Sequence, residues 1–147
     1  MKNKILWLAL LLFTSIAFAQ QQNATFTLTP EQFNPDDQVT ITVSNIDLSQ
    51  WGVSDLYLCT WFYDLNDENS QDSPTNGSWG NSDEAQKFTD NGNGTYSFTF
   101  IPQDLYGTSN IGSIGMLAKA KDGSGDKKTQ DHYVEVGVFQ FNLNNPT

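Results

Sequence analysis

The segment LYLCTWFY at residues 56–63 has the densest apolar and aromatic content of the chain after its N-terminal leader. In an extended strand, successive side chains point to opposite faces of the sheet. One face of this segment carries Leu56, Leu58, Thr60 and Phe62, and the other carries Tyr57, Cys59, Trp61 and Tyr63. The first set predicts a surface that faces the core. The second set is unusually aromatic for a solvent face, and its role is the main functional question.

Further short alternating segments surround this strand, separated by turns rich in Pro, Gly, Asn and Asp. The clearest is 38–43, whose valines and isoleucine share one face. Other strands are expected at 24–29, 95–100, 111–121 and 131–141, with a short strand or turn at 84–89 and a helical turn at 105–107. No segment has a sustained helical period. About seven short strands and almost no helix predict an immunoglobulin-like antiparallel β-sandwich.

Residues 1–19 have the pattern of a secretory signal peptide. Two lysines precede an apolar stretch at 5–13, and Ala17-Phe18-Ala19 matches a small-x-small cleavage signal. We expect cleavage after Ala19 and a secreted protein, extracellular or on the cell surface of a Gram-negative bacterium. The sandwich module is expected at 20–141, followed by a linker-like tail at 142–147.

Composition limits the classes of partner. Without the leader, the chain keeps five lysines against 17 acidic residues, a net charge of −12 with His neutral. Such an acidic surface repels phosphate backbones, so nucleic acid is not expected as a partner. No second hydrophobic segment approaches the length of a membrane span. Cys59 is the only cysteine, which rules out an intrachain disulfide.

The sequence has no recognisable catalytic constellation. His132 is the only histidine, and no Cys or Glu accompanies it at zinc-ligand spacing. No nucleophile elbow and no phosphate-binding glycine loop occurs. We therefore predict that this chain has no catalytic residues, no enzymatic activity of its own and no cofactor, and that His132 lies at a strand edge.

Two acidic loops leave calcium open as an alternative. Hard oxygen ligands occur between Asp64 and Asp72, and a second pair is Asp122 and Asp126. The first loop lacks the glycine at position six and the glutamate at position twelve that an EF-hand requires. We interpret both loops as solvated acidic segments without a metal.

The aromatic face is the best candidate for a binding site. In an immunoglobulin-like sandwich the third and sixth strands are neighbours, which would place the outward faces of 56–63 and 111–121 side by side. Indole and phenol rings stack on the C–H faces of sugars, whose hydroxyls need polar partners. The alternative is that the tryptophans only pack beneath the long loop at 64–81. The predicted ligand-binding residues are Trp61, Tyr63, Trp79, Lys119 and Lys121, with Trp61 and Tyr63 flanking the two lysines.

Several segments in order resemble a known module: the leader, WGVSD at 51–55, DSPTNGSW at 72–79, NGNGTYSF at 91–98 and KAKDG at 119–123. Together they resemble the N-terminal immunoglobulin-like module of secreted flavobacterial α-amylase-family (glycoside hydrolase family 13) proteins. They are also similar to modules in starch-binding outer-membrane proteins of that phylum. The resemblance covers nearly all of the chain after the leader. It implies an accessory module that binds starch or spaces a catalytic barrel, rather than a catalyst.

The sequence thus predicts a secreted, non-catalytic accessory module that binds neutral polysaccharide or oligosaccharide, with starch-like α-glucan as the expected ligand. The alternative is a structural or docking module of a larger α-amylase-family glycosidase. In that case this chain would be a fragment, and a following catalytic domain would be its partner.

Overall fold

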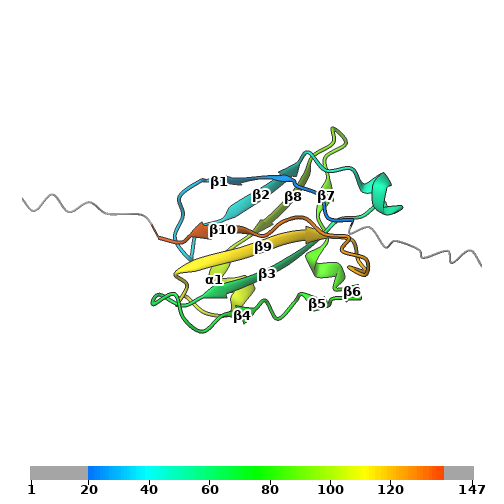
Figure 1. Cartoon of the computed structure of the whole chain (residues 1–147). Coiled ribbons are helices and arrows are strands. Elements are labelled where there is room, and N and C mark those ends of the chain that lie inside the picture. The colour runs from blue at the N-terminus through cyan, green and yellow to red at the C-terminus, as the bar shows by residue number, and fades with distance from the viewer. Residues whose placement is uncertain (1–19, 138–147) are drawn as a thin grey trace, which may run out of the picture.

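The computed structural model describes residues 20–137, which form two four-stranded antiparallel sheets with nearly no helix, consistent with a β-sandwich (Figure 1). The first sheet has the order β1-β2-β8-β7, with bounds Thr25–Thr29, Val39–Ser44, Tyr96–Phe100 and Thr89–Asp90. The second has the order β10-β9-β3-β4, with bounds His132–Glu135, Ser113–Lys119, Tyr57–Tyr63 and Gln71–Asp72.

Short elements complete the described part of the chain. The strands β5 (Gly77–Ser78) and β6 (Asn81–Ser82) form a small hairpin, and two 3-10 helices span Leu48–Trp51 and Glu84–Gln86. Within residues 20–137 the one α-helix, α1, spans Pro102–Tyr106 and overlaps the helical turn predicted at 105–107. No helix between residues 20 and 137 has the length and apolarity that a membrane crossing needs.

The core lies between the two sheets and confirms the predicted inward faces. Every second residue of β2 is fully buried, and β9 is buried along its whole length. On β3 and just before it, the predicted core residues are all buried: Leu56, Leu58, Thr60 and Phe62. Thr60 is tolerated there because its hydroxyl is 2.6 Å from the Tyr106 hydroxyl and donates to the carbonyl of Gly115 at 2.7 Å.

The pairing of β3 with β9 is confirmed, but its register differs from the prediction. Gly115 lies opposite Trp61, and Lys119 lies opposite Tyr57, four residues further along. The prediction that the aromatic pair flanks Lys119 and Lys121 is therefore wrong. A register shift by two or four residues leaves every side chain on its predicted face. The alternation pattern therefore cannot determine this register.

The element boundaries differ at several places. The strand predicted at 111–121 is observed at Ser113–Lys119, and the segment predicted as a short strand or turn at 84–89 contains a 3-10 helix and the first residue of β7. The loop predicted at 64–81 contains the two-residue strands β4 and β5 and the first residue of β6. The last predicted strand, 131–141, is observed at His132–Glu135, and residues 138–141 lie outside the described part of the chain. The predicted leader at 1–19 and tail at 142–147 also lie outside it.

Candidate functional site

The outward face of the second sheet presents a row of side chains that runs across all four strands. Tyr133 on β10 pairs with Gly115 on β9, Gly115 pairs with Trp61 on β3, and Trp61 pairs with Asp72 on β4. Directly opposed residues of antiparallel strands share a face. Two aromatic rings, a glycine and a carboxylate therefore lie side by side on one surface.

Trp61 lies across the backbone of Gly115. A Cβ atom added to Gly115 would lie 2.2 Å from both Cε2 and Nε1 of the indole. The ring of Tyr133 meets Trp61 edge-on, with centroids 5.9 Å apart and an interplanar angle of 76°. Trp61 is half-buried and Tyr133 is 55% exposed. The pair thus forms a corner, with the indole as its floor and the phenol as its wall.

Polar groups surround this aromatic corner. The Tyr133 hydroxyl donates to Oδ2 of Asp131 at a long 3.4 Å, and Asp72 is exposed beside Trp61. Further along β3, Tyr63 is half-buried opposite Ser113, whose hydroxyl donates to Asp67 at 3.0 Å. The corner therefore combines apolar ring faces with carboxylate acceptors.

Trp79 occupies a second position, at the turn of the β5–β6 hairpin. Its indole lies across Gly123, where an added Cβ would be 2.4 Å from Cε2 of the ring. The Gly123 backbone N–H also donates to the Trp79 carbonyl at 2.9 Å. Trp79 is 44% exposed and is not covered by the loop that contains it.

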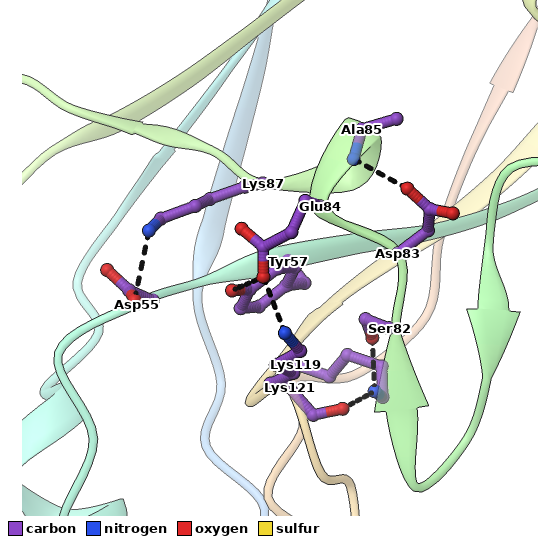
Figure 2. A network of polar contacts seen from close by, with 9 residues as sticks. All are labelled: Asp55, Tyr57, Ser82, Asp83, Glu84, Ala85, Lys87, Lys119 and Lys121. Carbon is purple, nitrogen blue, oxygen red and sulfur yellow. Dashed lines mark hydrogen bonds and ion pairs between the residues drawn. The ribbon is translucent and has the colours of Figure 1, made fainter.

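Lys119 lies beneath Trp79 rather than on the surface. Only 1% of Lys119 is exposed, and its Nζ is 5.1 Å from the centroid of the Trp79 ring. The ammonium donates to Oγ of Ser82 at 2.6 Å and to the carbonyl of Lys121 at 3.0 Å (Figure 2). Burial lowers the pKa of Lys119, partly offset by Asp122 and Cys59. Lys119, which the sequence predicts to donate to a sugar, is thus buried and packs beneath the indole of Trp79.

Lys121 is held in a separate network. Its Nζ donates to Oε1 of Glu84 at 2.6 Å, and the Tyr57 hydroxyl donates to the same oxygen at 2.9 Å (Figure 2). Lys87 forms a second ion pair, with Asp55 at 3.0 Å. Both ion pairs are solvent-exposed and contribute little stability by themselves. They link the 84–87 segment to the end of the sheet away from Trp61, and the Phe88 N–H also donates to the Leu56 carbonyl there at 2.8 Å.

The buried phenol of Tyr57 predicts a loss of stability at alkaline pH. Burial and the hydrogen bond to Glu84 raise its pKa to about 12, from an ordinary value of 10. The folded protein therefore retains a proton that the unfolded chain releases above about pH 10, so stability falls as the pH rises from about 10 to about 12. Unfolding midpoints measured by circular dichroism across this range should fall less steeply for Tyr57→Phe, and equal slopes would contradict the assignment.

The two acidic loops use their oxygens internally. Oδ1 of Asp64 accepts from the backbone N–H groups of Asn66 and Glu68, and Oδ1 of Asp122 accepts from the N–H and hydroxyl of Ser124. Within residues 20–137, no group of three or more His, Cys, Asp or Glu side chains is arranged to hold a metal. His132 lies on the edge strand β10, as predicted, with its ring stacked on Phe26 at 5.1 Å.

The predicted residues thus divide between two places on the sheet. Trp61 and Tyr63 lie near the aromatic corner, whereas Trp79, Lys119 and Lys121 lie at the opposite end of β3 and β9. Tyr133 and Asp72 are not among the predicted site residues. Tyr133 alternates with His132 and Val134 on β10, which indicates an outward position, but only the register places it beside Trp61.

A scan against protein-family models matches no family, and a search of curated proteins finds no significant match.

Proposed function

We propose that the chain is an immunoglobulin-like β-sandwich module that binds neutral polysaccharide on the outward face of the β10-β9-β3-β4 sheet and does not catalyse a reaction. The observation that carries this proposal is the corner formed by Trp61 and Tyr133 above Gly115. A sugar ring placed on the indole is also bounded by the phenol, and nearby carboxylates can accept from its hydroxyls.

The charge near the corner and the resemblance to known modules limit the class of polysaccharide that the chain is proposed to bind. Four acidic residues lie near the corner and disfavour an anionic polysaccharide: Asp67, Asp72, Asp131 and Glu135. Starch-like α-glucan is proposed because of the resemblance to α-amylase-family modules. The same resemblance and the leader support secretion, with cleavage after Ala19, and a following catalytic domain as a partner.

Electrophoresis through a native gel that contains amylopectin tests this proposal. We expect the wild type to migrate more slowly than in a gel without glucan, and Trp61→Ala to lose this retardation. Leu65→Ala is a matched control, because Leu65 is 69% exposed in the loop after β3 and its removal takes away apolar surface outside the corner. Equal mobility of the wild type in both gels would refute the function.

Gly115→Ala should weaken binding without removing an aromatic ring. The added methyl group would overlap the indole of Trp61, which must rotate away because it is a side chain with a solvent-exposed edge. We expect the dissociation constant for glucan to rise about tenfold, equivalent to about 1.4 kcal/mol. Affinity electrophoresis combined with thermal unfolding separates this effect from misfolding. Unchanged affinity would show that the position of the indole is unimportant.

A docking role is the second candidate, favoured by the exposure of large apolar side chains. Leu65, Trp79 and Tyr133 are the exposed large hydrophobic residues of the described chain. In this case the surface would pack against a neighbouring domain of a larger glycosidase. Glucan retardation by the isolated chain favours binding, whereas protection of Tyr133 from solvent in a longer protein favours docking.

A further inference from the structure

A small pocket lies between Trp79 and the Asp72 side of the aromatic corner. Its volume is about 160 Å³, below the roughly 300 Å³ at which sites for drug-sized ligands begin. It therefore accommodates about one ring rather than a length of polymer. The pocket is lined by Cys59, Asp72, Asn76, Gly77, Ser78, Trp79, Ser82 and Lys119.

The pocket lies directly beside the Trp61 corner. Asp72 pairs with Trp61 across β3 and β4, and Cys59 precedes Trp61 by two residues on the same face of β3. At the other end, Lys119 pairs with Tyr57, four residues from Trp61, or roughly 13 Å along the strand. A ligand seated on the corner can therefore reach the pocket from its Asp72 side.

The β5–β6 hairpin lines one side of the pocket. The Ser82 N–H donates to the carbonyl of Lys121 at 3.0 Å, and the Gly123 N–H donates to the carbonyl of Trp79 at 2.9 Å. These bonds attach the hairpin to the 121–123 turn. The small volume of the pocket suits a ring that ends there rather than a continuing polymer.

The walls of the pocket offer the mixture that a neutral sugar ring needs. Trp79 supplies an apolar face. The Lys119 ammonium has three N–H donors, two of which are used by Ser82 and the carbonyl of Lys121. Within the described residues, the Asp72 carboxylate accepts no hydrogen bond. The exposed Asp72 carboxylate therefore remains as the acceptor for the hydroxyls of a ligand, whereas the buried Lys119 supports the indole of Trp79.

We infer that this pocket receives a single sugar ring that projects from a glucan chain bound at the Trp61 corner. The inference rests on the proposed glycan-binding function. The ring has two possible sources with the same chemistry: a one-glucose branch, or the non-reducing end of the chain itself.

Calorimetric titration of the mature chain with three probes tests the inference. The probes are linear maltoheptaose, the same chain with its non-reducing end blocked by a 4,6-ethylidene group, and the blocked chain carrying one α-1,6-linked glucose. For a branch, we expect the wild type to bind the branched probe about tenfold more tightly than the blocked linear one, with Trp79→Ala reducing this ratio to about one. If the ring is instead the non-reducing end of the chain, we expect the wild type to bind unblocked maltoheptaose about tenfold more tightly than the blocked linear probe, and Trp79→Ala to remove this preference.

Two further variants complete the test. Asp72→Asn removes a charged acceptor on an exposed strand and should reduce the same ratio. Because this substitution is on the surface, it provides a second test of the pocket if Trp79→Ala fails to fold. Leu65→Ala should preserve the ratio. The inference is overturned if Trp79→Ala weakens all three probes equally, or changes none of them. Failure of the wild type to bind any probe would instead refute the proposed function.

Discussion

Replacement of Asn76 by alanine is expected to lower the free energy of unfolding by about 3 kcal/mol and the unfolding midpoint by roughly 10 °C. The neighbouring strand β4 pairs with β3 only at Trp61 and Phe62. At Thr60 the Asn76 side chain takes its place: Oδ1 accepts from the Thr60 N–H at 3.1 Å, and Nδ2 donates to the Thr60 carbonyl at 2.8 Å.

The cost is large because these groups are buried. Thr60 is 1% exposed, so loss of the Asn76 amide leaves a buried N–H group without an acceptor. Oδ1 of Asn76 also accepts from Nε2 of Gln86, which is fully buried and loses this bond too. The Thr60 carbonyl still accepts from the Ser73 N–H at 2.9 Å, so this carbonyl keeps a partner and the loss of stability is smaller than it would otherwise be.

Thermal and urea unfolding of Asn76→Ala and Asn66→Ala provide the measurement. Asn66 is exposed in the same long loop, and its side chain makes no hydrogen bond within residues 20–137, so Asn66→Ala should remain close to wild type. If Asn76→Ala unfolds at the same midpoint as this control, the side chain does not take the place of a strand neighbour.

The faces of the strands were predictable from the sequence because alternation has a period of two. Val39, Ile41 and Val43 repeat this period without interruption, and burial of one face then determines which side chains point inward. The same alternation places Trp61 on the outward face of β3. These predictions need only local pattern and the drive to bury apolar surface.

The composition of the site could not be predicted in the same way, because it depends on contacts between distant segments. Lys119 has an outward position on β9, and nothing in its neighbourhood in sequence indicates burial. Its burial results from the β5–β6 hairpin, whose strands are two residues long and carry no alternation signal. The hairpin is attached through Ser82 and Gly123, which are unremarkable residues in sequence.

Gly112→Ala is the second substitution with a large expected effect, a loss of about 3 kcal/mol in the free energy of unfolding. An added Cβ at this position would lie 2.3 Å from the backbone oxygen of Asp64 and 3.1 Å from Cα of Leu65. The loop that leaves β3 therefore crosses directly over Gly112. The Gly112 N–H also donates to the Tyr63 carbonyl at 2.8 Å, which holds the two segments together.

The type of obstacle distinguishes Gly112 from Gly115. At Gly115 the added methyl group meets an indole that can rotate, so the loss falls on binding; at Gly112 it meets backbone, so the chain itself must move. Gly80→Ala is a control, because its nearest neighbour would be Oδ1 of Asp122 at 4.0 Å. We expect thermal unfolding to rank the midpoints as Gly80→Ala highest and Gly112→Ala lowest. A Gly112→Ala midpoint equal to that of Gly80→Ala would mean that the loop after β3 moves aside without cost.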